Sequence, residues 1–164
     1  MIDTSLKLLD QGYYELGFAL DGLAPENVWK RPAPGLLSVG ELAGHCAYWM
    51  AIRLAGEGED LSKCRITSPL IDNRFRYYRG TIAEAPSEQH LAMSAEQVLA
   101  ELKRVHAESI AAFKELNPDP DSKIPGDKWF TYAQYLEYAV FHTAYHTGQM
   151  YSVRHLLGEE TPDN

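Results

Sequence analysis

Apolar residues recur at the 3.6-residue helical period in four segments of the chain, and no segment shows the alternation of a half-buried strand. The first helix is expected over about 3–22, with Leu6, Leu9 and Leu16 on its apolar stripe. The others are expected over roughly 38–56, 94–116 and 131–157. The pattern therefore predicts an all-α protein with four main helices and little or no sheet.

Three of these segments open with a residue pair at capping-box spacing, in which a hydroxyl caps the helix and a side chain three residues later reciprocates. Proline or glycine follows each predicted helix end, and Gly158 is expected to close the last helix. The three pairs are Ser38 with Glu41, Ser94 with Gln97, and Thr131 with Gln134.

The connection from Gly58 to Met93 is much longer than the usual loop between helices. A helix of twenty residues is about 30 Å long, so a long connection lets the second and third helices run parallel. We therefore expect residues 1–164 to form one four-helix bundle with up-down-down-up topology. The aromatic and basic stretch from Arg74 to Arg79 predicts either a lid or aromatics packed on the bundle with arginines facing water.

Composition and charge narrow the possible partners. The 164 residues are 45% hydrophobic, which is typical of a globular domain, and their net charge of −8 disfavours binding to nucleic acid or anionic membranes. The sequence shows no secretory signal or membrane span, and its two cysteines make no disulfide framework. We expect a cytoplasmic protein.

The two cysteines have different settings. Cys46 lies within the second predicted helix and is expected to be inert core packing. Cys64 lies between Lys63 and Arg65, a cationic setting that lowers a thiol pKa. Neither is assigned a catalytic role.

Three histidines are candidates for a metal site. His142 and His146 are four residues apart and therefore share a face of the fourth helix, while His45 lies at the edge of the apolar stripe of the second. Neighbouring helices pack about 8 to 10 Å apart, a gap that imidazoles holding one ion can bridge. The spacing leaves two interpretations open: a metal site, or a neutral hydrogen-bonded polar core.

The remaining histidines are weaker candidates. His106 lies at the edge of the stripe of the third helix and is a reserve ligand. His90 falls in the long connection, and His155 points away from the stripe of the last helix.

Several residues together resemble the DinB-like superfamily. They are Trp29 and Pro32 ahead of a Ser-Val-Gly-Glu-Leu helix start, then His45, and finally the stretch His-Thr-Gly-Gln-Met that begins at His146 and contains Gly148 and Gln149. The resemblance covers essentially the whole chain. It implies an up-down-down-up bundle, often a homodimer, in which His45, His142 and His146 hold a divalent metal such as zinc or nickel.

The resemblance also implies a range of functions. Characterised relatives include metal-dependent transferases and isomerases that use low-molecular-weight thiols. We therefore expect a metal-dependent transferase or hydrolase acting on a small electrophile, with Gln149 and Tyr138 as candidates to orient a ligand, contact substrate or donate a proton. The alternative is a non-catalytic metal-binding bundle, which a fourth protein ligand such as His106 would favour.

Overall fold

The computed structural model describes residues 2–161 and contains four long helices. They are α1 (Ile2–Leu20), α2 (Val39–Ala55), α4 (Ala95–Leu116) and α5 (Tyr132–Leu156). In the described part of the chain the only extended pairing is an isolated bridge between Lys123 and Thr131. The predicted all-α class is therefore confirmed.

The helices begin where the capping residues predict. Ser38, Ser94 and Thr131 are the N-caps of α2, α4 and α5, and each forms the reciprocal pair of bonds of a capping box. Gly158 follows α5 with φ of 78°, so the helix ends in the left-handed conformation that glycine tolerates best. Local hydrogen-bonding chemistry thus sets the boundaries of the bundle.

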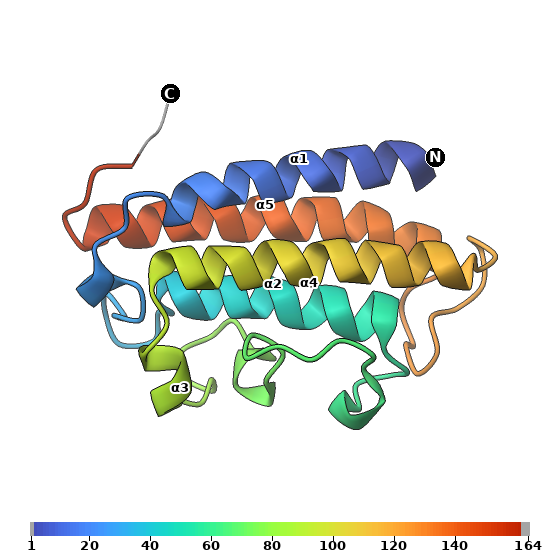
Figure 1. Cartoon of the computed structure of the whole chain (residues 1–164), viewed down its shortest axis with the longest axis horizontal. Coiled ribbons are helices and arrows are strands. Elements are labelled where there is room, and N and C mark those ends of the chain that lie inside the picture. The colour runs from blue at the N-terminus through green and yellow to red at the C-terminus, as the bar shows by residue number, and fades with distance from the viewer. Residues whose placement is uncertain (1, 162–164) are drawn as a thin grey trace.

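The topology is up-down-down-up, as predicted. In Figure 1, α1 and α5 run in one direction while α2 and α4 both run in the other. The most extensive packing is between α1 and α5 and between α2 and α4, and α2 also lies against α5. This last contact brings the histidine-bearing faces of α2 and α5 together.

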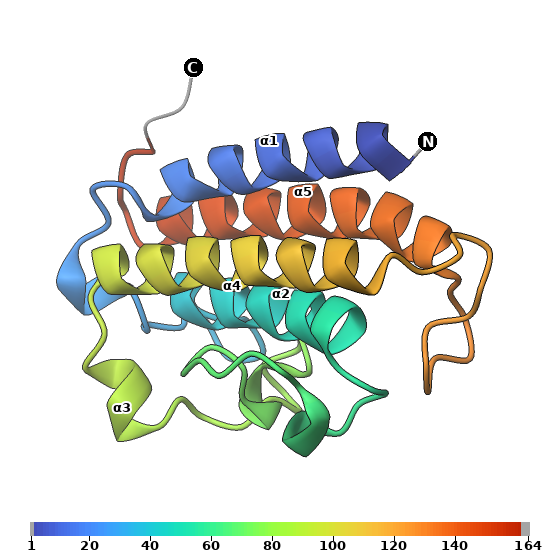
Figure 2. The ribbon, with the colours of Figure 1, turned by 45° about the vertical axis from the view of Figure 1, so that its right-hand side comes forward.

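Residues 58–93, here called the crossover, return the chain along the outside of the bundle (Figure 2). Sequence reasoning did not predict its short elements: η2 (Leu61–Lys63), η3 (Asn73–Phe75) and α3 (Glu88–Leu91). Phe75 is buried against α2, where Gly44 leaves room for its ring. The crossover is therefore part of the core.

The segment before α2, including the turn η1 (Pro25–Asn27), anchors the end of the crossover. The indole of Trp29 donates to the carbonyl of Met93, and Arg31 binds the buried carboxylate of Glu41.

No helix within residues 2–161 is long and apolar enough to span a bilayer.

Candidate metal centre

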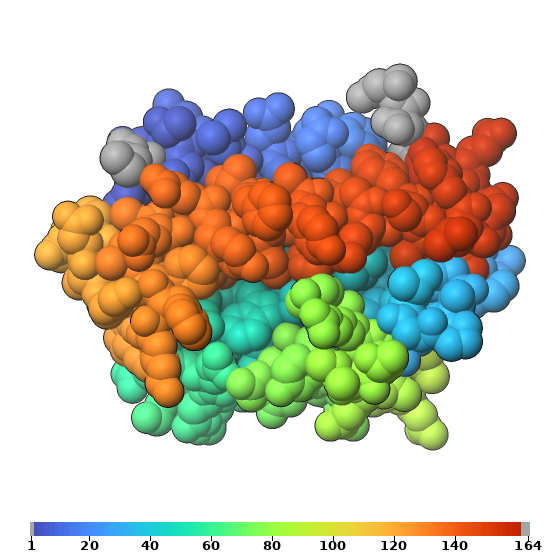
Figure 3. Space-filling model, turned by 180° about the vertical axis from the view of Figure 1, so that it is seen from behind, coloured from blue at the N-terminus to red at the C-terminus, as the bar shows by residue number. Residues whose placement is uncertain are grey.

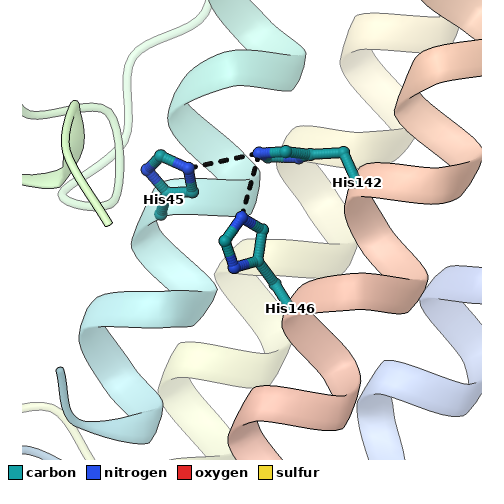
Figure 4. A group of neighbouring side chains, drawn as sticks. All are labelled: His45, His142 and His146. Carbon is teal, nitrogen blue, oxygen red and sulfur yellow. Dashed lines mark hydrogen bonds between the residues drawn. The ribbon is translucent and has the colours of Figure 1, made fainter. Parts of the chain in front are cut away.

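The three predicted histidines meet between α2 and α5 (Figure 4). The Nε2 atom of His142 lies 3.2 Å from Nε2 of His45 and 3.1 Å from Nε2 of His146. His45 and His146 are almost fully buried, and His142 is half-buried. Residues 97 positions apart in the sequence are thus brought into one cluster.

Hydrogen bonds on the far side of two rings fix which nitrogen carries the proton. Nδ1 of His45 lies 2.7 Å from the backbone carbonyl of Phe75, and Nδ1 of His146 lies 2.6 Å from Oε1 of Gln149. Both partners are oxygen acceptors, so both Nδ1 atoms must donate. In the neutral rings the Nε2 atoms of His45 and His146 therefore carry lone pairs, and these point at the shared centre.

The converging lone pairs cannot all be satisfied by hydrogen bonds within the cluster. The single Nε2 proton that His142 can carry would face two acceptors at once. A cation at the centre satisfies all three. Ligand nitrogens at 2.0 to 2.1 Å from a tetrahedral ion are about 3.3 Å apart. This is close to the distances from Nε2 of His142 to Nε2 of His45 and of His146.

Burial also keeps these imidazoles neutral. Loss of solvation, with a further contribution from the neighbouring His146, lowers the pKa of His45 to about 3 and that of His142 to about 2. The pKa of His146 is lowered by burial as well, against the opposing bond from Gln149. All three therefore present the unprotonated form that a metal requires.

A cavity of about 430 Å³, here called the pocket, opens from the histidines. Figure 3 shows the hollow, with atoms of α2 at its floor between α5 and the crossover. Tyr138, on its wall, has a ring centroid 5.6 Å from that of His142 and a hydroxyl pKa raised by burial. Besides the three histidines, the pocket is lined by Trp49, Arg53, Arg76, Tyr77, Tyr78, Phe130, Tyr135, Tyr138, Phe141 and Tyr145.

The aromatic stretch of the crossover lies partly in the core and partly at the pocket. Phe75 is buried, whereas Tyr77 and Tyr78 stay partly exposed at the pocket. The ring of Tyr78 lies 5.8 Å from that of His45 and 5.7 Å from that of His146. Packing on the bundle is therefore confirmed for Phe75, while a lid formed by Tyr77 and Tyr78 stays a prediction.

The other candidate ligands lie elsewhere. His106 contacts Asp10 at 2.8 Å and stacks on Tyr13, so it is no reserve ligand for the cluster. His90 completes the capping box that Ser87 begins at α3, and it contacts the carbonyl of Pro69. Within residues 2–161 the cluster has three ligand residues and no fourth.

The cysteines also lie outside the cluster. Burial raises the pKa of Cys46 to about 12, which agrees with an inert core thiol. The expectation of a lowered pKa at Cys64 is wrong, because burial raises it more than Arg65 lowers it. The cationic neighbours of Cys64 are visible in the sequence, but the half-buried position of its thiol is not.

Two features of the site were not predicted from the sequence. One is the Phe75 carbonyl, which comes from 30 residues away and carries no side-chain signal. The other is Arg53, which lines the pocket together with Arg76 of the basic and aromatic stretch. Arg53 follows His45 by eight residues, so its shared helix face could have been recognised from spacing.

Comparisons with known proteins agree with this architecture. A sequence model described as the DinB superfamily matches residues 8–150, a span that includes all three histidines. Searches of curated proteins and of solved structures found no match to this chain.

Proposed function

The chain belongs to the DinB superfamily, and from this premise we propose that it is a metal-dependent enzyme whose metal ion is held by His45, His142 and His146. Zinc and nickel are the proposed ions, since imidazole nitrogen suits both. The observation that carries the proposal is the orientation of the rings: Phe75 and Gln149 hold protons on the far nitrogens and aim lone pairs at one point.

The surroundings of the cluster favour catalysis over a structural metal. Structural zinc sites are closed by four protein ligands, whereas catalytic sites keep a position open for water or substrate. No fourth ligand joins the cluster among the described residues, and the pocket begins at the histidines. A small molecule in the pocket would therefore reach the ion directly.

The reaction we propose is the transfer of a nucleophile to a small electrophile. When bound, a divalent ion supplies Lewis acidity that lowers the pKa of a thiol or of water at the open position. The three imidazoles remain neutral and hold the ion, and the aromatic walls exclude bulk water and pack on the electrophile. The Tyr138 hydroxyl, protonated at neutral pH, can donate a proton to the departing group.

The nucleophile is a low-molecular-weight thiol for a transferase or water for a hydrolase. In both reactions the histidines, the aromatic walls and Tyr138 have the same roles. Assembly as a homodimer, expected from the family resemblance, stays a prediction.

The first test is metal content. Protein purified without a chelator should hold about one divalent ion per chain, and the His45→Ala, His142→Ala, His146→Ala triple variant should hold none while it keeps its helical content. His155→Ala is the matched control, because His155 is exposed, lies outside the cluster and contacts Thr161. A wild type that takes up neither zinc nor nickel would contradict the proposal.

The second test is activity. Thiol conjugation can be followed with glutathione or cysteine and 1-chloro-2,4-dinitrobenzene, and hydrolysis with 4-nitrophenyl acetate. Turnover should require the metal and be lost in the triple variant but not in His155→Ala. A loaded protein that fails with every thiol and ester would instead support the non-catalytic alternative.

A further inference from the structure

The pocket has a second polar end, away from the histidines. His45, Trp49 and Arg53 are spaced four residues apart on α2 and line the same pocket. Eight residues of helix rise about 12 Å, so the backbone positions of His45 and Arg53 are separated by that distance along the axis. A small molecule can therefore extend from the histidines, across the indole of Trp49, to a guanidinium group.

The guanidinium end consists of Arg53 and Arg76. Arg53 is buried, lies over the ring of Trp49 at 4.7 Å, and forms ion pairs with Asp127 at 2.8 Å and Glu59 at 3.4 Å. Arg76 extends from the crossover, and its Nη2 atom pairs with the same Glu59 carboxylate. The two guanidinium groups thus share the carboxylate of Glu59, and Arg53 also pairs with Asp127.

Within residues 2–161, positively charged side chains line the pocket, and negatively charged ones do not. Both arginines line it, while no aspartate or glutamate among the described residues does so. The chain carries 23 acidic residues and 15 basic ones. The charged residues of the lining are therefore opposite in sign to the net charge of the protein. An anion inside the pocket would therefore meet positive groups and no lining carboxylate from the described part of the chain.

Arg76 has the greater capacity to bind an additional anion. Arg53 already contacts two carboxylates, and its side chain is buried. The Nε and Nη1 atoms of Arg76 have no hydrogen bond or ion pair to a described residue, and its side chain is 38% exposed. A guanidinium with free donors on one edge suits a carboxylate, which it can bind through two parallel bonds.

We propose that the pocket takes a small molecule that carries a carboxylate, and that Arg76 binds this carboxylate while the rest of the molecule extends toward the histidines. The proposal rests on the proposed function and names the class of its substrate: a carboxylic acid whose reacting group lies several bonds from the acid. Arg53 and Glu59 position Arg76 at the end of the pocket.

The test compares acids with alcohols of the same length. The probes are 6-mercaptohexanoate against 6-mercaptohexanol, and hexanoate against hexanol, with dissociation constants measured by NMR titration of zinc-loaded and metal-free protein. Each acid should bind about tenfold more tightly than its alcohol, as expected for one charge-assisted contact. Hexanoate should keep this preference in the metal-free protein, where a carboxylate cannot bind an ion instead.

Three variants assign the preference to Arg76. The preference should fall to about one in Arg76→Gln and to an intermediate value in Arg76→Lys, which keeps the charge but not the two parallel bonds. It should be unchanged in Arg74→Gln, because Arg74 lies in the same segment, is paired with Asp72 and does not line the pocket. Circular dichroism confirms folding, and Arg76→Lys keeps the test valid if the glutamine variant unfolds. Equal affinities in the wild type, an unchanged preference in Arg76→Gln, or equal losses in both glutamine variants would overturn the proposal.

The outcomes also separate this inference from the proposed function. If the histidines bind no metal, zinc will not strengthen thiol binding, but metal-free protein will still prefer hexanoate over hexanol. If zinc strengthens thiol binding while acids and alcohols bind equally, the metal site stands and the carboxylate site is wrong.

Discussion

Adding one methyl group at Gly44 should damage both stability and metal binding. A Cβ atom at this position would lie 2.6 Å from Cγ and Cδ2 of Phe75, closer than carbon atoms that are not bonded approach each other. Phe75 is only 2% exposed, so its ring cannot simply swing into solvent. The crossover would have to move away from α2, and with it the Phe75 carbonyl that accepts from His45.

The size of the effect follows from two opposing contributions. Overpacking a buried position costs about 1–3 kcal/mol, whereas replacing glycine by alanine inside a helix gains about 1 kcal/mol. Gly44→Ala should therefore lower the free energy of unfolding by up to about 2 kcal/mol. Loss of the bond that orients a metal ligand typically weakens metal affinity by about 10–100-fold.

The chain supplies a matched control in Gly148. This glycine is also inside a helix and lies between His146 and Gln149, yet a Cβ atom there meets nothing within 4 Å. Gly148→Ala has the same gain in helix propensity without the clash, so it should raise stability by about 0.5–1 kcal/mol. Its zinc affinity should stay at the wild-type value.

Urea unfolding followed by circular dichroism gives the free energies, and competition with a chromophoric chelator gives the zinc affinities. The two variants should differ in stability by about 1–3 kcal/mol, which is the overpacking contribution alone. If Gly44→Ala were as stable as Gly148→Ala and bound zinc as the wild type does, the crossover would not orient His45 in the way described.

Three further predictions concern the orientation, protonation and capping of the same helices. Gln149→Leu should weaken zinc binding about 10–100-fold because it removes the acceptor for His146, while Gln149→Glu keeps an acceptor and should bind zinc nearly normally in chelator competition. Metal-free protein should lose stability as pH falls from 7 to 5: the unfolded chain takes up protons near pH 6.5, but His45 and His142 stay neutral in the fold until about pH 3 and 2. Urea unfolding at both pH values should show a smaller loss in the His45→Ala, His142→Ala variant. Ser94→Ala should lower the unfolding free energy by about 1 kcal/mol, since it removes the N-cap of α4.

The parts of the fold that local chemistry determines could be predicted from the sequence. In a capping box, a hydroxyl and a glutamate or glutamine side chain three residues later accept hydrogen bonds from backbone N–H groups at the start of the helix. These bonds form within a few residues and do not depend on distant contacts. The starts of α2, α4 and α5 at Ser38, Ser94 and Thr131 follow from this. The convergence of the histidines was predictable for a related reason, since their helix faces are set by spacing alone.

The crossover could not be predicted in the same way, because its conformation depends on contacts distant in sequence. Phe75 packs where Gly44 leaves space, and neither residue signals the other in the sequence. Cys64 illustrates the same limit: its charged neighbours were visible, but the burial that raises its pKa was not. Exposure is a property of the folded chain rather than of adjacent residues.

Residues 75–78 connect the two ends of the pocket. The Phe75 carbonyl orients His45, the ring of Tyr78 lies beside His45 and His146, and Arg76 lies at the guanidinium end. A bundle with the same capping boxes and histidines but without Phe75 packed against α2 would lose part of its core. Such a bundle would keep the three imidazoles but lose one orienting bond, one wall and one cation. The crossover therefore adds a wall to the histidine cluster and so forms a pocket, and Gly44, by admitting Phe75, makes that possible.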